Sequence, residues 1–344
     1  MDGLINRFKW IRKKRIIQKS YHAKYAFVGI GNHSIHNLYP VLAYLNAPLK
    51  YIVSKSEKTT ELVQKNYPSV IATTDFDKVL NDSEIAGIFI CSDPKSHFQL
   101  TQKALCSNKC VFVEKPVCLS SSELQSLIQT SKENQSNCVV GMQKRYSTCT
   151  KLLNKRLKLN QVISYNYRFG VGAYPEGNII WDIFIHPVDL IIHLFGKIET
   201  VSIRKTHDNN GILSVLLQVT HENIIGSVEV STAYSWSQPF EELVVNTKTG
   251  VYEMKNHQLL TFAPKLQTIL SIPLEKIISN RSEKQILFDG NSFLPVPKNN
   301  LLVSQGYFDE INSFINICEN KTNKNDSTPE SLSETYRILE LITE

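Results

Sequence analysis

A Glu-Lys-Pro triplet, Glu114 to Pro116, stands where a short apolar run ends. Charged residues seldom follow a buried strand directly unless a polar group nearby interacts with them. At that position the ammonium of Lys115 would hydrogen-bond a substrate oxygen while a hydride leaves or arrives, and it would stabilise developing negative charge. X-Pro peptide bonds are the ones that adopt the cis form, and a cis bond here would turn Lys115 toward a bound ligand.

The segment WDIFIHPVDL (181–190) places two carboxylates and an imidazole on one face of a predicted helix. Asp182 and His186 are four residues apart and His186 and Asp189 are three apart, spacings that share a helical face. A histidine beside a carboxylate suits general acid or base catalysis near neutral pH. The alternative is a solvated surface stripe, which we would favour for an isolated Asp-His pair. Pro187 would kink a helix interior or place the helix start at His186.

A glycine turn, GIGNHS (29–34), follows the first predicted strand and precedes a helix. In a dinucleotide-binding fold, Gly29 would make the tight turn and Gly31 would let the backbone approach a pyrophosphate. Amide groups at the helix start, from Asn32 onward, would then hold the phosphate. The motif is short, but its context favours cofactor binding over a turn that simply needs two glycines.

The end of the second predicted strand is the usual place of an acid that binds the ribose hydroxyls of NAD. This chain has Ser54, Lys55 and Ser56 there, with no acid. Hydroxyls and an ammonium suit a 2′-phosphate better, so the sequence favours NADP over NAD. An ordinary solvated lysine at position 55 is the alternative.

The motifs described above lie on two different patterns of predicted strands and helices. In the first, continuous apolar strands alternate with helices, which predicts a doubly wound parallel sheet covered on both faces. The predicted strands are 24–30, 49–54, 69–73, 85–91, 109–113 and 137–142, and the predicted helices are 38–45, 57–67, 75–81, 96–107 and 120–134.

The pattern changes after about residue 144 and predicts a second α/β domain with an open, mostly antiparallel sheet. The predicted strands are 162–170, 199–206, 211–220, 223–234, 240–247 and 250–256, and the predicted helices are 146–158, 181–196, 303–320 and 331–344. The expected organisation is a basic extension (1–22), a Rossmann domain (23–144) and a substrate-binding and oligomerisation domain (145–344).

The basic charge is confined to the N-terminus. Residues 1–24 carry a net charge of +7 and the other 320 residues a net charge of −1. Ile, Phe and Trp interrupt the basic residues, which is compatible with an amphipathic helix on an anionic membrane, but we favour a solvated extension. Charge limited to a tail, without a binding motif, argues against a nucleic-acid partner.

Seven cysteines are scattered without a CxxC pair, and no long apolar segment is present. This usage predicts reduced thiols in a cytoplasmic protein, with no metal site.

The glycine turn, the loop CSDPKSH (91–97), EKP and the pattern DxxxHxxD occur at separations that resemble the Gfo/Idh/MocA oxidoreductases, and the resemblance covers residues 24–344. It implies a nicotinamide-binding Rossmann domain and a second domain whose sheet mediates dimer or tetramer contacts. It implies cofactor contacts from Gly29, Gly31, Asn32, Ser54, Lys55, Ser92, His97, Glu114 and Lys115. It implies catalytic roles for Lys115, Asp182 and His186, and substrate contacts from these three and Arg145.

Two positions depart from the family pattern. Ser34 replaces the third small residue of the glycine turn, and Ser92-Asp93 stands where relatives carry Thr-Pro, with Pro94 one place late. The second change lies in the loop expected against the nicotinamide ribose.

The function expected is an NAD(P)-dependent oxidoreductase that acts on a secondary alcohol of a sugar, sugar nucleotide or cyclitol. In this hypothesis His186 takes the hydroxyl proton, Asp182 orients it, and Lys115 holds the oxygen. Residues 168–178, including Arg168 and Tyr174, are expected near the substrate, although solvated loop side chains are the alternative. A glycosidase that uses transient oxidation and a non-catalytic cofactor-binding regulator are the rival interpretations.

Overall fold

The contacts of the chain divide it into two compact units. A computed structural model describes residues 2–17, 21–158, 161–175, 177–207, 213–266, 268–270, 272–276, 283–290 and 300–344. The first unit comprises Met1–Glu114, Leu127–Val139 and Ile311–Asn325, and the second comprises Lys115–Ser126, Val140–Glu310 and Asp326–Glu344.

This grouping is less simple than the single cut predicted after residue 144. Residues 311–325 join the first unit because the ring of Phe314 packs 4.9 Å from that of Phe89 and 6.5 Å from that of Tyr25. Apolar burial of this kind is the main favourable term in folding, and a helix far along the chain supplies part of it here.

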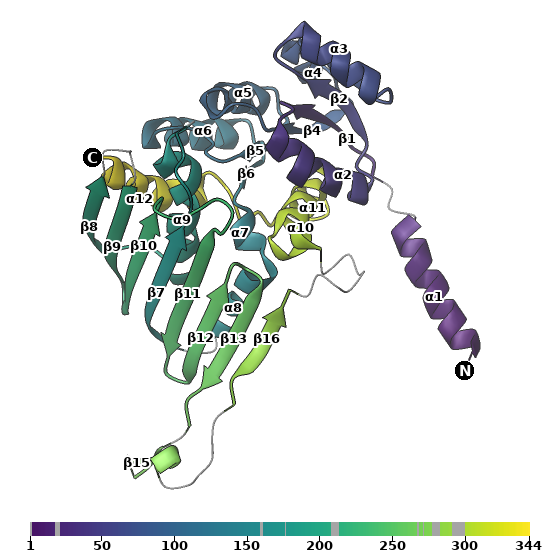
Figure 1. The fold of residues 1–344 in the computed structure, drawn as a ribbon. Helices are drawn as coiled ribbons and strands as arrows, with labels where there is room; N and C mark the ends of the chain where they lie inside the picture. Colours follow the sequence, from purple (N-terminus) through teal and green to yellow (C-terminus); the bar gives the residue numbers. More distant parts are fainter. Residues whose placement is uncertain are drawn as a thin grey trace. The chain divides into compact units, whose positions relative to one another are not determined.

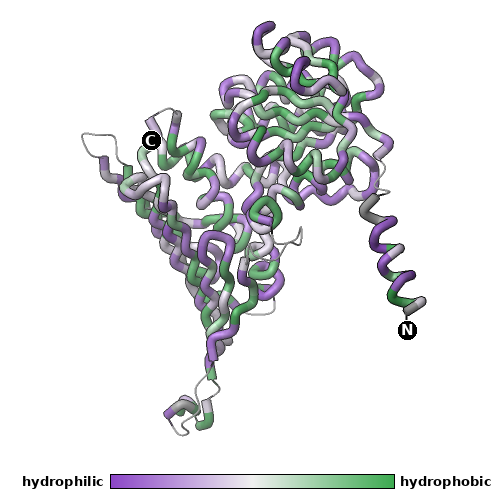
Figure 2. Tube along the Cα trace, turned by 45° about the vertical axis from the view of Figure 1, so that its right-hand side comes forward, coloured by the Kyte–Doolittle hydropathy of each residue, from purple (hydrophilic) through white to green (hydrophobic). Residues whose placement is uncertain are grey.

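Strands β1 to β5 and the first half of β6 lie in the first unit. With the rest of β6 they form the six-stranded parallel sheet that the sequence predicts, in the order β3-β2-β1-β4-β5-β6 (Figure 1). Its strands are β1 (Lys24–Val28), β2 (Leu49–Val53), β3 (Ile71–Thr73), β4 (Ile85–Ile90), β5 (Cys110–Glu114) and β6 (Cys138–Gly141). Most residues of these strands are buried, as a sheet covered on both faces requires. Figure 2 shows the sheet as a mainly hydrophobic layer between more hydrophilic helices.

Helices follow these strands in the order expected of a doubly wound fold. They are η1 (Ser34–Leu38) continuing into α2 (Tyr39–Leu45), α3 (Glu57–Asn66), α4 (Phe76–Leu80), α5 (Pro94–Cys106) and α6 (Ser121–Glu133), and α11 (Tyr307–Cys318) is added from far along the chain. Ser56, Asp75 and Asp93 cap the N-termini of α3, α4 and α5, since each side chain accepts a hydrogen bond from a backbone amide of the first turn. Short polar residues after the strands therefore start these helices.

The second unit is built on an eight-stranded sheet in the order β16-β13-β12-β11-β7-β10-β9-β8, and Figure 1 shows its strands side by side. The pair β7–β10 at its centre is parallel and the other pairs are antiparallel. The strands are β7 (Val162–Gly170), β8 (Thr200–His207), β9 (Leu213–His221), β10 (Ile224–Ser231), β11 (Phe240–Thr247), β12 (Gly250–Lys255), β13 (Leu259–Pro264) and β16 (Gln285–Asp289), with a separate short pair β14 (Thr268–Ile269) and β15 (Ile272–Pro273). The first two residues of the predicted strand 211–220 lie outside the described residues.

Burial alternates along the central strands of this sheet, so one face lies against the core and the other is more exposed. The helical segments are α7 (Gln143–Tyr146), α8 (Thr148–Leu157), η2 (Ile180–Phe184), α9 (Ile185–Phe195), η3 (Leu274–Lys276), α10 (Leu301–Ser304), η5 (Glu330–Leu332) and α12 (Ser333–Thr343). Among them, α9 contacts β10, α8 contacts β13 and β16, and α12 contacts α9. The catalytic motif predicted from sequence therefore lies on a helix that packs against this sheet.

Two of the predicted helices are interrupted. The helix predicted over 303–320 breaks at Gly306, whose φ is +102° and where a Cβ atom would lie 2.0 Å from the carbonyl oxygen of Gln143. Only glycine fits such a position without strain. The helix predicted over 146–158 begins instead at Ser147, whose hydroxyl caps α8, and strands β13 to β16 were not predicted.

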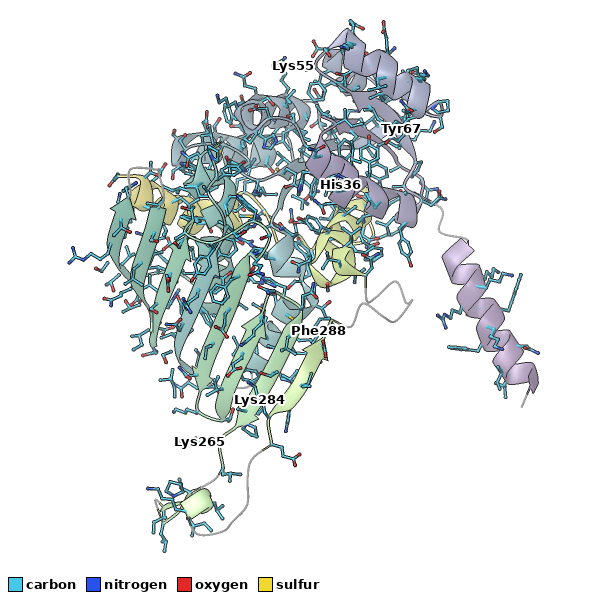
Figure 3. The ribbon with its side chains drawn as sticks, viewed as in Figure 1. His36, Lys55, Tyr67, Lys265, Lys284 and Phe288 are labelled. Atoms are coloured by element: carbon cyan, nitrogen blue, oxygen red, sulfur yellow. The ribbon has the colours of Figure 1, made fainter. Side chains whose placement is uncertain are left out.

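The basic segment forms the helix α1 (Asp2–Ile17), but it is not amphipathic. Phe8 and Trp10 are both exposed and are two positions apart, so they point to nearly opposite sides of the helix. Figure 3 shows the side chains of α1 spread around its axis. This corrects the amphipathic interpretation and agrees better with the solvated extension that the sequence favours.

Candidate functional site: a dinucleotide cavity and a lysine beside the histidine helix

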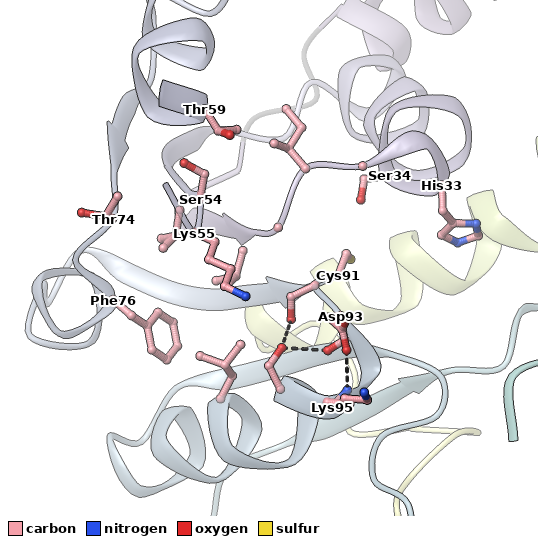
Figure 4. A pocket seen from close by; sticks show the side chains of 18 of the residues that line it. His33, Ser34, Ser54, Lys55, Thr59, Thr74, Phe76, Cys91, Asp93 and Lys95 are labelled. Carbon is pink, nitrogen blue, oxygen red and sulfur yellow. Dashed lines mark hydrogen bonds between the residues drawn. The ribbon is translucent and has the colours of Figure 1, made fainter. Parts of the chain in front are cut away.

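A cavity of about 980 Å³ lies at the carboxyl ends of β1, β2 and β4 in the first unit (Figure 4). This is the edge of a doubly wound sheet where nucleotides bind, and the volume is at the upper end of the range for ligand pockets. The cavity is lined by the predicted cofactor residues Gly29, Gly31, Asn32, Ser54, Lys55 and Ser92.

The two glycines of the turn have different physical roles. Gly29 has a φ of +89°, and a Cβ atom there would lie 2.6 Å from the carbonyl oxygen of Cys91, so the turn needs glycine. A Cβ atom at Gly31 would meet no atom within 4 Å, which leaves room for a ligand against the backbone. The helical segment that begins next to Gly31 directs its first amide groups to this place, and such amides favour anions. These residues fit a bound diphosphate.

The side chains after β2 lie at the cavity but not in equivalent ways. The hydroxyl of Ser54 is buried and lies 2.6 Å from that of Thr60, so it helps to shape the start of α3. Lys55 is exposed, and Figure 4 shows its amine pointing into the cavity. Lys55 is therefore the better placed of the two to contact an anionic group.

The loop between β4 and α5 is braced by its own side chains. Ser92 and Ser96 hydroxyls lie 2.7 Å apart, and the backbone amide of Lys95 donates to Asp93 at 2.9 Å. His97 is buried, and its Nε2 atom lies 3.0 Å from the carbonyl oxygen of Ser92. His97 is not among the residues that line the cavity, so the geometry favours a role in holding the loop. The direct cofactor contact of His97 stays a prediction.

Glu114 also stands outside the cavity lining. It is buried at the end of β5, and its Oε1 atom lies 3.3 Å from Nε2 of His33, the second residue after Gly31. This contact links the end of β5 to the glycine turn. The cofactor contact of Glu114 stays a prediction.

In the second unit, Lys115 lies beside the histidine helix. The peptide bond between Lys115 and Pro116 is cis, and the lysine ammonium donates a hydrogen bond to the main-chain oxygen of Asp182. The carboxylate Oδ2 atom of Asp182 accepts a hydrogen bond of 2.9 Å from the amide of Asn178. His186 follows one turn later and is almost buried. The structure thus sets the Lys115 ammonium against the main chain of Asp182, one helical turn before His186.

The start of this helix explains how Pro187 is accommodated. A turn of π-helix, η2, precedes α9, and Pro187 is the third residue of α9. Proline has no N–H to donate to the preceding turn, and the winding changes from π-helical to α-helical just before it. Pro187 therefore follows His186 without ending the helix.

Arg145 and Asp189 form a buried ion pair. The Arg145 Nε atom donates to Oδ2 of Asp189 at 2.8 Å and its second terminal nitrogen donates to Oδ1. The first terminal nitrogen donates to the carbonyl oxygen of Asp326 and to Oγ of Ser331 at 2.8 and 2.7 Å. Burial lowers the pKa of Arg145, but the Asp189 carboxylate outweighs this and holds the pKa above its ordinary value. This geometry favours a role in holding α9 over direct contact with substrate, which stays an untested prediction.

Sequence reasoning missed several residues of the cavity. Thr59, Thr74, Phe76, Lys95 and Gln99 line it as well. They lie in or just before the helices that follow β2, β3 and β4. Their position just after parallel strands is the feature of the sequence that could have identified them.

A second buried cluster was also missed. Both oxygens of the Glu241 carboxylate are engaged: Lys144 donates to one at 2.6 Å, while His257 Nε2 lies 2.9 Å from the other and the hydroxyl of Tyr167 donates to it. Burial raises the pKa of Glu241, but Lys144 and His257 more than offset this and hold the pKa well below its ordinary value. Residues distant in sequence form this cluster, so no local sequence pattern predicts it.

Replacing Glu241 by Gln is expected to lower the free energy of unfolding at pH 7 by roughly 3 kcal/mol, because Lys144 stays buried without its counter-charge. The pKa of Glu241 is depressed in the folded state, so its stabilisation is present above the unfolded-state pKa of about 4.3 and is lost as the pH falls through the lower folded-state value. The difference between the two proteins should therefore shrink below about pH 4. Urea unfolding at several pH values measures it, with the more exposed neighbour Glu242→Gln as control; equal stability of wild type and Glu241→Gln at pH 7 would contradict the expectation.

Among the described residues, no group of three His, Cys, Asp or Glu side chains is arranged to hold a metal ion. Within the same residues, no helix combines the length and the apolar character that crossing a bilayer requires. None of the seven cysteines, all of which the structure describes, forms a disulfide.

The parallel sheet, the glycine turn and the cavity define a Rossmann-type fold with a cavity that fits a dinucleotide. Residues 23–142 match the family model described as "Oxidoreductase family, NAD-binding Rossmann fold", named Gfo/Idh/MocA. Residues 23–142 thus resemble the NAD-binding domain of this family, as the sequence motifs predicted.

Relatives and solved structures agree with this assignment. The chain is 25% identical to the uncharacterized oxidoreductase YhhX of Escherichia coli over 40% of its own length and 43% of that protein. It is 25% identical to scyllo-inositol 2-dehydrogenase (NAD(+)) of Bacillus subtilis over 51% of its length and 57% of that protein. The matches thus span about half the length of the curated relatives. A dehydrogenase structure from Chromobacterium violaceum superposes with a TM-score of 0.81 at 17% identity, covering 94% of this chain and 95% of that one, which shows a shared fold.

Proposed function

We propose that the protein is an NAD(P)-dependent oxidoreductase that transfers a hydride between the nicotinamide and a secondary alcohol of a sugar, sugar nucleotide or cyclitol. The single observation that carries the proposal is the pairing of Lys115 with the start of the Asp182–His186 helix, although 67 residues separate Lys115 from Asp182. The B. subtilis relative named as a scyllo-inositol dehydrogenase supports the substrate class. A homodimer or homotetramer is part of the proposal, on the family resemblance alone.

The chemistry assigns one role to each group. A bound nicotinamide supplies the hydride acceptor. Lys115 donates a hydrogen bond to the substrate oxygen and stabilises its developing negative charge. His186 takes the hydroxyl proton, and Asp182 orients the substrate and the imidazole. Chain continuity supports this division, because Lys115 directly follows Glu114, the last residue of β5, and ligands of such sheets bind beyond the carboxyl ends of the strands.

The test begins with titration of the purified protein with NAD, NADH, NADP and NADPH, followed by tryptophan emission and by calorimetry. Trp181 precedes Asp182 and is a natural reporter. The preferred cofactor is then combined with myo-inositol, scyllo-inositol, D-glucose and UDP-N-acetylglucosamine, and formation of reduced cofactor is recorded. Absence of cofactor binding would refute the proposal, and glycoside cleavage without net cofactor reduction would favour the transient-oxidation mechanism instead.

We further propose NADP as the preferred cofactor, because Lys55 points into the cavity where an acid would favour NAD. Lys55→Ala is expected to weaken NADPH binding roughly 10-fold, since a hydrogen bond to a charged group contributes about 1.5–3 kcal/mol, and to change NADH binding less than about two-fold. Calorimetry with both cofactors measures this. Lys58→Ala is the matched control, because Lys58 is exposed on the helix α3 that follows Lys55 but does not line the cavity. Equal losses for NADH and NADPH would argue for a general electrostatic effect.

A further inference from the structure

Two aromatic side chains lie directly over glycines of the second unit. A Cβ atom at Gly170 would lie 2.3 Å from the ring of Tyr234, and one at Gly172 would lie 2.4 Å from the ring of Trp236. Any larger residue at these two positions would displace the rings. The segment after β10 is therefore seated on the end of β7 and the residues that follow it.

Trp236 is held in one orientation but is not buried. Its indole nitrogen donates a hydrogen bond of 2.6 Å to the carbonyl oxygen of Ala173, and its ring centroid lies 6.2 Å from that of Tyr174. Even so, 49% of Trp236 is exposed to solvent. A tryptophan whose polar edge is satisfied, and whose surface is still half in water, is well suited to pack against a ligand.

This aromatic pair, Trp236 and Tyr174, adjoins the predicted catalytic carboxylate. A Cβ atom at Gly177 would lie 2.3 Å from Oδ2 of Asp182 and 2.5 Å from Cε1 of Tyr174. The carboxylate and the tyrosine ring edge thus border the same point, and the ring of Trp236 lies next to that of Tyr174. All four residues belong to the second unit.

We propose that Trp236 and Tyr174 form a platform on which a six-membered polyol ring, a pyranose or a cyclitol, packs its C–H face. This rests on the proposed function and names the shape of the substrate. Polyol rings with equatorial hydroxyls present C–H groups on both faces, and these pack favourably against aromatic surfaces. Stacking would place ring hydroxyls toward Asp182, beside Lys115, where the proposed hydride transfer takes place.

The test measures binding of myo-inositol, D-glucose and UDP-N-acetylglucosamine to wild type, Trp236→Ala and Trp236→Phe by calorimetry with saturating cofactor. Trp236→Ala should weaken binding of at least one of these ring polyols roughly 5- to 10-fold, and Trp236→Phe should keep most of the affinity because it retains an aromatic face. Trp10→Ala, a change to an exposed tryptophan of α1, is the matched control. Thermal unfolding shows whether each variant is folded.

Turnover separates this proposal from the proposed function. Where wild type turns over a ring substrate, Trp236→Ala should raise KM by the same factor and change kcat less than about three-fold. Equal affinities and equal KM values in wild type and Trp236→Ala would overturn the platform and leave the oxidoreductase function standing. Trp236-dependent binding without turnover would overturn the function and leave the platform standing. Binding of none of the three probes to wild type would overturn the platform.

Discussion

Replacing Lys115 or His186 by alanine is expected to reduce turnover at least 10³-fold while leaving the affinity for the nicotinamide cofactor within about two-fold. Lys115 would no longer stabilise negative charge on the substrate oxygen, and His186 would no longer accept the hydroxyl proton. The cavity would be unchanged, because neither residue lines it. Initial rates of cofactor reduction and calorimetric cofactor titrations measure the two quantities.

The controls are His193→Ala, seven residues after His186 on the same helix, and Lys151→Ala, a half-exposed lysine paired with Asp309. Both should keep turnover within a few-fold of wild type. For Lys151 the reason is that a surface ion pair contributes little. Lys115→Arg separates charge from shape, because it keeps the charge but changes the donor geometry. Full activity of Lys115→Ala or His186→Ala would remove that residue from the catalytic assignment.

The second large effect is expected from the buried pair of Arg145 and Asp189. Replacing Asp189 by Ala should lower the free energy of unfolding by roughly 3–5 kcal/mol, because the guanidinium would stay buried without its counter-charge. Thr335, whose hydroxyl donates to the same carboxylate at 3.2 Å, would lose a partner as well. Urea unfolding of the variant measures the loss.

The double variant Arg145→Met with Asp189→Leu tests the reason for this loss. Removing both charges together should recover part of the stability, since a well-packed apolar pair often replaces a buried ion pair without large cost. The exposed pair of Arg168 and Glu229, each side chain 42% exposed, is the matched control, and Arg168→Ala should cost less than about 1 kcal/mol. If Asp189→Ala lowers the free energy of unfolding no more than Arg168→Ala does, the buried pair does not hold α9 in place.

Much of the first unit could be predicted from sequence. Its buried strands are continuous apolar runs and its helices start at short polar residues such as Ser56 and Asp93, so local patterns contain the information. The same holds for the glycine turn, because the positive φ of Gly29 is a local requirement. The contribution of α11 could not be predicted, since nothing in its own sequence says that Phe314 packs against Phe89.

The second unit was less predictable. Strand-like runs in the sequence predicted strands β7 to β12, but the parallel pairing of β7 with β10 depends on a long connection, and strand order is not a local property. Strands β13 to β16 were not predicted from the sequence. The break between helices α10 and α11 at Gly306 follows from a close backbone approach to Gln143, which no local sequence pattern contains.

The candidate site divides in the same way. The sequence alone predicts which groups would carry the chemistry, because Asp182 and His186 share a helical face through their spacing and Lys115 follows a strand directly. Only the tertiary structure decided their partners. It set Lys115 against the main chain of Asp182, and it buried Arg145 against Asp189, where the sequence suggested a substrate contact. The physical reason is that spacing along one element orients side chains relative to each other, whereas the approach of distant segments depends on how the whole core packs.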